Sequence, residues 1–226
     1  MVAGWVENND TIMIEQMPIF GGYAGGLEES TIIDMASHLI SYTMYHCDWH
    51  LDGPIHVRWG ITTARECLAM AGHVAAAFNK IKPNILIGNQ YYPLSGPCTN
   101  MCLKEVAAQA MTDTVSGREI MSGSASAKGV LKDYTTSMES KMMSEAAEAV
   151  AGLDVSEANQ IIDELVSSYE DNYMEADQTK DPDNTELGNG KKMQECYNMD
   201  DLTPTDKYFE IYQSTKNELE ELGLKF

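Results

Sequence analysis

Two short apolar segments of the sequence each end in polar side chains that could perform acid–base chemistry on a small ligand. Glu15 follows the first segment, and Gln90 and Tyr92 follow the second, where they alternate with Tyr91. Alternation places two side chains on the same side of an extended stretch. A carboxyl group can exchange a proton with a substrate, while an amide and a phenol can orient a polar ligand. The alternatives are a surface acid at Glu15 and ordinary loop hydrogen bonds at Gln90 and Tyr92.

Other chemically versatile side chains do not form a recognisable metal site. Cys98 and Cys102 are four residues apart and are predicted to lie on one helix, but two thiolates without a nearby third ligand make a poor zinc site. Core packing is the favoured interpretation of both residues. His50 and His56 flank a turn signal at 52–54, where hydrogen bonding is favoured over metal binding. We therefore predict no bound metal.

Alternating strands and helices are predicted to position these residues. Each expected strand is a short apolar run, and the helices show apolar residues at helical spacing. Thr63 and Glu66 have the spacing of a capping box at the start of the second helix. The first helix, expected over residues 28–45, has one apolar stripe made of Ile32, Ala36, Leu39, Ile40 and Thr43. The expected strands cover residues 11–14, 55–59, 84–88 and 118–121.

The order of strand and helix implies parallel strands joined by right-handed crossovers. A doubly wound open sheet and a (β/α)8 barrel both fit this order. No Gly-x-Gly-x-x-Gly or P-loop follows a strand, so a nucleotide-binding open sheet loses support. Polar residues at the carboxyl ends of strands, including Ser122 and Ser124, favour a barrel, because barrels place their active sites there.

The expected barrel is incomplete. Four strand–helix units are recognisable, whereas a barrel has eight. A half barrel would leave strand edges unpaired and one sheet face bare. We therefore expect an α/β chain that forms the C-terminal half of a (β/α)8 TIM barrel with additional C-terminal helices. Residues 1–175 would form this half, 176–192 an acidic polar loop or insertion, and 193–226 a C-terminal helical segment.

The composition limits the function further. The 226 residues include 15 Lys and Arg against 35 Asp and Glu, and the formal net charge is −20. Such a surface would repel the phosphates of nucleic acids and of anionic membranes. The acidity reflects either simple solubility or a salt-rich cytoplasm that screens the carboxylates. No apolar run is long enough to span a bilayer and the N-terminus lacks a signal-peptide pattern, so we expect a cytoplasmic protein.

Four motifs, in the same order as in a known family, make the sequence recognisable. They are EQMPIFGGYAGG at 15–26, WHLDGP at 49–54, GNQYYP at 88–93, and the stretch 112–120. With them the chain closely resembles the C-terminal half of the pyrrolysine-containing monomethylamine methyltransferases of methanogenic archaea. The resemblance covers nearly the whole chain except the polar loop.

The resemblance implies both an activity and the residues that perform it. Members of the family are homo-oligomeric barrels that transfer the methyl group of monomethylamine to the Co(I) of a cognate corrinoid protein, which carries the cobalamin, in methanogenesis from methylamine. Capture of the amine is attributed to the electrophilic imine ring of their pyrrolysine. A Glu, a Gln and a Tyr surround that ring, and they match Glu15, Gln90 and Tyr92 here. Glu15 would be catalytic and manage the proton on the ring nitrogen or the ammonium, while Gln90 and Tyr92 would bind the substrate.

The pyrrolysine segment lies upstream in the family, and we expect this chain to lack it, with an in-frame amber codon preceding Met1 in the gene. The isolated chain would then be inactive. Two other interpretations stay open. The chain could be a non-catalytic half-barrel fragment or subunit that needs a separately encoded front half. It could also be an unrelated barrel hydrolase with Glu15 as general acid, but a second carboxylate about 5–10 Å away would then be required.

Overall fold

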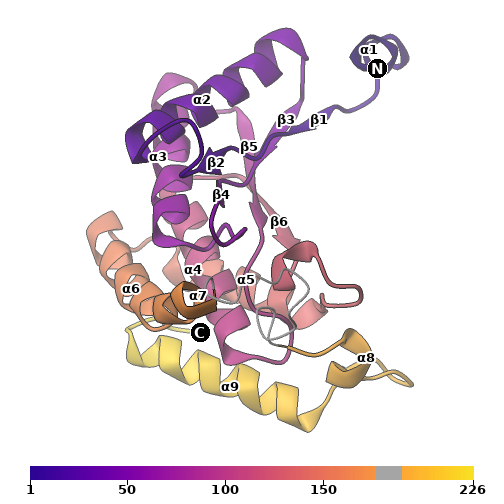
Figure 1. The fold of residues 1–226 in the computed structure, drawn as a ribbon, viewed down its shortest axis with the longest axis vertical. Coiled ribbons are helices and arrows are strands. Elements are labelled where there is room, and N and C mark those ends of the chain that lie inside the picture. Colours follow the sequence, from indigo (N-terminus) through magenta and orange to yellow (C-terminus); the bar gives the residue numbers. More distant parts are fainter. Residues whose placement is uncertain (177–189) are drawn as a thin grey trace.

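A four-stranded parallel sheet organises the fold, with the strand order β1–β3–β5–β6 (Figure 1). The computed structural model describes residues 1–176 and 190–226. The strands of the sheet are β1 (Met13–Glu15), β3 (Trp49–Asp52), β5 (Leu86–Tyr91) and β6 (Ile120–Ser124). Each pair of neighbours is joined by a crossover through a helix, which is why the strands run parallel.

The crossover helices are α2 (Leu27–Met44), α3 (Arg65–Ile81) and α4 (Asn100–Ser116). Two short strands, β2 (Ile19–Phe20) and β4 (Ile55–His56), pair in parallel after β1 and β3. No helix in the described part of the chain is long and apolar enough to cross a membrane. The remaining elements are α1 (Val2–Asn8), η1 (Ala127–Gly129), α5 (Ser137–Val150), α6 (Val155–Ser167), α7 (Glu170–Ala176), α8 (Met193–Cys196), β7 (Tyr197–Asn198), β8 (Thr203–Pro204) and α9 (Asp206–Glu221).

The register of the sheet places the candidate residues on one face. Glu15 pairs with Leu51, Leu51 with Gly88, and Gly88 with Ile120. Residues that pair in this way point to the same side of the sheet, and the side alternates along each strand. Gln90, two residues after Gly88, therefore shares the face of Glu15.

The two faces of the sheet differ in burial. On the face of Glu15, Met13 is 39% exposed and Leu86 is 44% exposed, although Leu51 on the strand between them is buried. On the opposite face, Ile87 packs against α3 and the ring of His50 stacks on a histidine of α2. Among residues 1–176 and 190–226, helices therefore cover the opposite side, and we call the side of Glu15 the open face.

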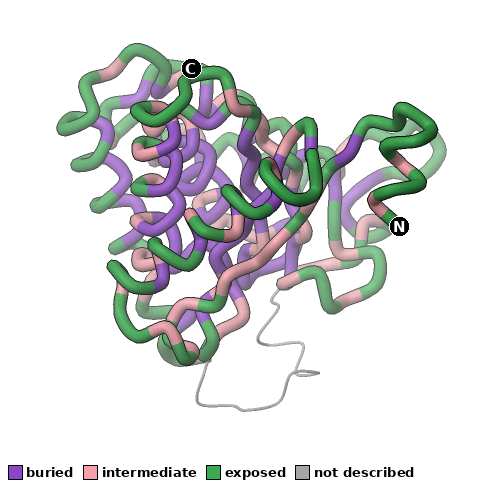
Figure 2. Tube along the Cα trace, turned by 90° about the horizontal axis from the view of Figure 1, so that it is seen from above, coloured by how far each residue is buried: buried purple, intermediate pink, exposed green. Residues whose placement is uncertain are grey.

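Helix α4 lies at the centre of the hydrophobic core and is buried along most of its length. Its N-cap is Thr99, whose hydroxyl accepts a hydrogen bond from the Cys102 amide at 3.2 Å. Its end is marked by Gly117 at a φ of 83°, a left-handed conformation that glycine adopts most easily. Helices α5, α6 and α9 contact α4, and Figure 2 shows the buried residues gathered in the interior of the molecule.

The second strand begins earlier than the sequence predicts. The expected strand at 55–59 is wrong, because the sheet uses Trp49–Asp52 and only Ile55–His56 pair with β2. Pro54 has no N–H to donate to a ladder, so the turn separates two strands instead of preceding one. The ring of His50 stacks on that of His38 and the carboxylate of Asp52 bonds to Arg118, so both polar residues are buried in the strand. Polar residues of this kind are easily taken for part of a loop.

Two expected helix starts are also wrong. Helix α3 begins after Ala64 without a side-chain cap, because the hydroxyl of Thr63 donates to Glu105 at 2.6 Å instead of capping the helix. Cys98 lies before α4, with a φ of 64°, so it does not share a helix with Cys102. Both cysteines are buried. The segment boundary expected near residue 175 stays a prediction, since most of the loop, 177–189, lies outside the described residues.

Helix α2 has its polar residues inside and its apolar residues outside. The buried side of the helix consists of Ser30, Asp34, His38 and Ser41. In the apolar stripe that the sequence suggests, Ile32 is 66% exposed and Leu39 is 45% exposed. The hydrophobic pattern of this helix therefore does not mark the side that packs on the sheet.

Candidate active site on the open face

Gln90 and Tyr92 come together at the carboxyl end of β5, as the sequence predicts. The side-chain amide nitrogen of Gln90 lies 3.5 Å from the hydroxyl of Tyr92. The amide oxygen of Gln90 contacts the hydroxyl of Ser122 on β6, which is also 2.8 Å from the Asn89 carbonyl oxygen. Ser122 thus holds the amide with its oxygen toward β6 and its N–H groups toward Tyr92.

A bulge in the sheet brings Ser122 to this position. Asn89 pairs with Met121, but Tyr91 pairs with Ser124, so β6 has one extra residue opposite Gln90. Gly123 has a φ of 101°, which favours glycine at the bulge. Bulges re-aim side chains next to active sites, and here the bulge directs the Ser122 hydroxyl at Gln90.

A second layer of bonds fixes the main chain behind Gln90 and Tyr92. Gln109 on α4 donates to the carbonyl oxygen of Gln90 at 2.7 Å and accepts from the hydroxyl of Thr62 at 2.7 Å. The Tyr92 amide donates to that hydroxyl at 2.8 Å, and its carbonyl oxygen accepts from the Thr62 amide at 3.1 Å. Thr62 and Gln109 are buried, so the end of β5 is held rigidly from the covered side.

Glycines leave room for the same two side chains. A Cβ added to Gly53 would lie 2.9 Å from the Cβ of Gln90, and one added to Gly129 would lie 3.0 Å from the ring of Tyr92. Both positions therefore require close approach of the backbone. The absence of a side chain at Gly53 and at Gly129, which has a φ of 68°, lets the backbone pass close to Gln90 and Tyr92.

Glu15 lies on the same open face but does not contact the pair. It ends β1, two strands away from β5, which corresponds to roughly 10 Å across the sheet. Among the described residues, no hydrogen bond joins Glu15 to Gln90 or Tyr92. Its side chain is exposed, whereas the sequence suggests a partly buried acid. A small ligand lying on the open face over β3 would have the carboxylate on one side and the amide–phenol pair on the other.

Glu105 anchors the loop that leaves this site. Its carboxylate accepts from the amides of Leu94 and Ser95 at 2.8 and 3.0 Å, and from the hydroxyl of Thr63. Burial raises the pKa of Glu105 to about 7, although these three donors oppose the rise. A carboxyl group with a raised pKa in the folded state supports folding most at acidic pH, and this support is lost as the pH rises toward 7.

Replacing Glu105 by Gln should therefore flatten the pH dependence of stability. Between pH 5 and 7, the free energy of unfolding of the wild type should fall relative to Glu105→Gln by about 1 kcal/mol per pH unit. Urea unfolding at several pH values measures this difference. Parallel pH profiles for the two proteins would contradict it.

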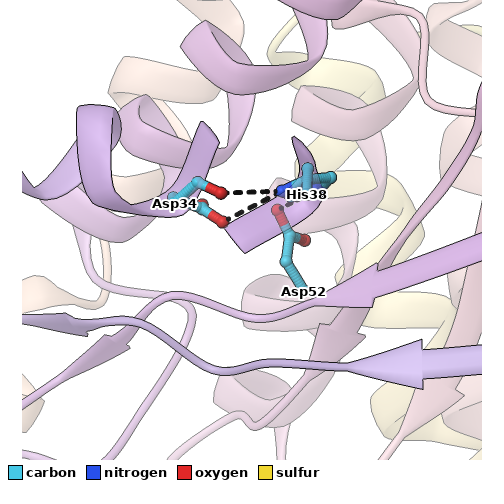
Figure 3. Close-up of side chains that lie close together, drawn as sticks. All are labelled: Asp34, His38 and Asp52. Atoms are coloured by element: carbon cyan, nitrogen blue, oxygen red, sulfur yellow. Dashed lines mark hydrogen bonds and ion pairs between the residues drawn. The ribbon is translucent and has the colours of Figure 1, made fainter. Parts of the chain in front are cut away.

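A second polar cluster lies on the covered face of the sheet (Figure 3). His38 has its Nδ1 2.9 Å from the carbonyl oxygen of Asp34 and its Nε2 3.5 Å from a carboxylate oxygen of Asp52. Burial raises the pKa of Asp34 to about 7. Burial alone would lower the pKa of His38, but the bonds and charges of the two aspartates raise it overall.

This cluster has the residue types of a metal site, but the carboxylate of Asp52 is already paired. Asp34, His38 and Asp52 could bring three ligand atoms within 4.8 Å of one another. However, both oxygens of Asp52 accept from the guanidinium of Arg118, at 2.6 and 2.8 Å. A cation bound there would face this guanidinium at close range. We therefore assign the cluster to ion pairing between the sheet and α2.

A family model described as monomethylamine methyltransferase MtmB matches residues 1–224. The chain belongs to this family. It is 52% identical to MtmB2 of Methanosarcina barkeri and to MtmB1 of Methanosarcina acetivorans over all 226 of its residues. The chain spans about half the length of these MtmB relatives, 47% in each case.

Solved structures of MtmB confirm the fold. The crystal structure of the M. barkeri monomethylamine methyltransferase matches this chain with a TM-score of 0.92 at 52% identity, over 100% of this chain and 47% of the other. The crystal structure of the hydroxylamine MtmB complex matches equally well. The resemblance drawn from the four motifs is therefore confirmed, and so is the expected α/β fold of half a (β/α)8 barrel with additional C-terminal helices.

Several residues that support the candidate site were missed in the sequence, although a signal for them exists. Glu105, Gln109 and Asp113 are spaced four residues apart in α4, so they form one buried polar stripe on the helix. Asp113 accepts from Asn89 and Tyr91 at 2.9 and 2.7 Å. All three members of the stripe bond to β5 or to the loop after it. A buried polar stripe at helical spacing thus indicates where a site is supported.

Proposed function

We propose that this chain forms part of an enzyme that transfers the methyl group of monomethylamine to the Co(I) of a cognate corrinoid protein in the cytoplasm. Membership in the MtmB family supports the reaction class. The observation that carries the assignment of residues is the shared open face, on which Glu15, Gln90 and Tyr92 lie at the carboxyl ends of parallel strands. The cobalamin belongs to the partner, so this chain needs no cofactor site of its own.

Each of the three residues has a role that its position allows. When a methyl group leaves an amine, the nitrogen keeps the electron pair and becomes easier to release if it receives a proton. Glu15 is the acid that manages this proton. The amide N–H groups of Gln90 and the hydroxyl of Tyr92 orient the bound amine, with Ser122 holding the amide in position. The family's pyrrolysine, which we place outside this chain, would supply the electrophile that captures the amine.

The second candidate function is a non-catalytic half barrel that pairs with a separately encoded front half. Its support is the open face, where Met13 and Leu86 are 39% and 44% exposed. The chain also matches only 47% of each relative. In the proposal, the assembled barrel is homo-oligomeric and the isolated chain has no turnover.

A complementation experiment tests the proposal. The chain is co-expressed with the amino-terminal half of the M. barkeri relative, including its pyrrolysine, and methyl transfer from monomethylamine to the corrinoid protein is measured. We expect turnover for the pair and none for the chain alone. A stable pair without turnover would favour the non-catalytic interpretation. Turnover by the chain alone would contradict the placement of the electrophile outside it.

Removing the hydroxyl of Ser122 should lower the rate of this reaction moderately. Ser122→Ala frees the amide of Gln90 to rotate, and one neutral hydrogen bond of about 0.5–1.5 kcal/mol corresponds to a rate loss of about 2- to 10-fold. Steady-state assays of the reconstituted pair should show the loss mainly in kcat/KM for methylamine. Ser124→Ala is the control, because Ser124 bonds to Ser126 and not to Gln90. Equal losses in both variants would refute the role of Ser122.

A further inference from the structure

Two cysteines meet where the C-terminal segment packs on the loop that follows β5. Cys98 lies in this loop, directly before the N-cap of α4, and Cys196 is the last residue of α8. Lys191 joins the two segments. Its amide donates to the carbonyl oxygen of Pro97 at 2.9 Å, and its own carbonyl oxygen lies 3.6 Å from the Cys196 sulfur. The main chain therefore holds Cys196 beside the loop that carries Cys98.

The thiols of Cys98 and Cys196 contact each other directly. The Cys196 thiol donates a hydrogen bond to the sulfur of Cys98. The sulfur of Cys102 lies 3.5 Å from the hydroxyl oxygen of Ser126 instead. A disulfide requires its two side chains to lie side by side in this way. Both members of the pair belong to this chain, so their contact does not depend on the part of the relatives' length that the chain does not span.

Charge and exposure make Cys98 the more reactive of the two cysteines. Burial raises the pKa of Cys98, but the ammonium groups of Lys191 and Lys207 oppose this rise. Burial raises the pKa of Cys196 to about 12, and the charge of Cys98 adds to that rise. Cys98 is 8% exposed, whereas Cys196 is fully buried. Because the thiolate is the nucleophile in thiol chemistry, an oxidant reacts with Cys98 first.

We propose that Cys98 and Cys196 form a reversible oxidation site, which hydrogen peroxide converts into a disulfide between the loop after β5 and α8. The Cys98 sulfur attacks one oxygen of the peroxide, so that an S–O bond forms, the O–O bond breaks, and the other oxygen leaves as water with the thiol proton. The Cys196 sulfur then attacks the sulfur of this sulfenic acid. The S–S bond forms, and the hydroxyl leaves as a second water with the proton of Cys196. The two thiols lose two electrons, which the peroxide gains, and an added dithiol reverses the reaction by exchange.

The position of the pair gives the disulfide two consequences. The loop that carries Cys98 follows Tyr92 directly, and the carbonyl oxygen of Cys196 accepts from the amide of Thr205, the N-cap of α9, at 2.8 Å. The bond would therefore fasten the start of α9 to the loop beside the candidate active site. Reaction with Cys196 also removes the sulfenic acid before a second peroxide can oxidise Cys98 irreversibly.

Peroxide treatment of the 226-residue chain, followed by thiol titration in denaturant, tests the site. The structure has five free thiols. We expect the titre to fall from five thiols per chain to three and to return to five with dithiothreitol. Peptide mapping should find Cys98 joined to Cys196. A titre that stays at five, a loss that dithiothreitol does not reverse, or a disulfide between any other cysteines would overturn the proposal.

Two variants separate the pair from general thiol oxidation. Cys47→Ser is the matched control, because Cys47 is also 8% exposed but the charge that acts on it is the carboxylate of Asp48. This variant should still lose two thiols. Cys196→Ser should form no disulfide within the chain, and dimedone should trap the sulfenic acid of its Cys98. A loss of two thiols from Cys196→Ser that dithiothreitol reverses would contradict the proposal.

Alkylation of the native wild type provides a readout that needs no substitution. A maleimide should label Cys98 faster than Cys47, since lysines face the first thiol and an aspartate the second. Prior treatment with peroxide should abolish labelling of Cys98 and leave that of Cys47, and dithiothreitol should restore it. Equal loss of labelling at the two positions would contradict the proposal. Methyl transfer is not measured, so these outcomes are separate from that of the complementation experiment.

Discussion

Methyl transfer by the reconstituted pair should fall by about 10²- to 10⁴-fold when Glu15 is replaced by Gln. The substitution keeps the size and hydrogen-bonding shape of the side chain but removes the proton that the departing nitrogen needs. Glu15 ends β1 on the open face, in register with Leu51. Because the side chain is exposed and makes no hydrogen bond to Gln90 or Tyr92, the substitution should leave the fold unchanged.

The loss should appear in kcat, with the KM for the corrinoid protein nearly constant. Glu7→Gln, at an exposed position of α1, is the matched control and should retain the wild-type rate. A rate for Glu15→Gln within about threefold of the wild type would remove Glu15 from the mechanism. Such a result would not change the proposed role of Gln90 and Tyr92 in orienting the amine, because substitutions of these two residues test that role separately.

Replacing Arg118 by Leu should lower the free energy of unfolding by about 3–5 kcal/mol. The buried guanidinium bonds to both oxygens of Asp52 and to the carbonyl oxygens of Gly88 and Ala71, the last two at 2.7 and 2.8 Å. Its Nε also lies 3.3 Å from Asp113. Without the guanidinium, two buried carboxylates lose their counter-charge, and the link between β3, β5 and α3 is lost.

Urea unfolding followed by circular dichroism measures this effect. Arg65→Leu is the control, because Arg65 is 38% exposed and pairs with Asp163 and Glu170 near the surface, where such pairs contribute about 1 kcal/mol or less. The double variant Arg118→Leu/Asp52→Asn should recover part of the loss, since it removes one of the stranded charges. Equal losses for the variants at 118 and 65 would contradict the structural role given to the buried cluster.

Much of the fold follows from local patterns. Helix α4 was expected from its apolar residues at helical spacing, although its start after Cys98 was not. The strands β1, β5 and β6 follow short apolar runs. Strand β3 could not be found in this way, because His50 and Asp52 are polar in sequence and buried in the structure. Asp52 is buried beside Arg118, which comes from another strand–helix unit, and His50 is buried beside His38 of α2.

The candidate site also depends partly on local sequence and partly on tertiary structure. Alternation along the chain is enough to place Gln90 and Tyr92 together, whereas the choice of Glu15 came from the family resemblance. The bulge at Gly123, which turns Ser122 toward Gln90, depends on the pairing of two strands. The stripe of Ile32 and Leu39 likewise looks like a core stripe until the sheet determines which side of α2 is buried.

By itself, the sequence determined the family, the parallel strand–helix order and the three residues that end up on one face, because these depend on motifs and on the periodicity of a single segment. Only the tertiary structure decided which charges are buried, how Ser122 holds Gln90, and which side of α2 faces solvent. The physical reason is that burial of a charge is favourable only beside its partner, and that partner comes from another part of the chain.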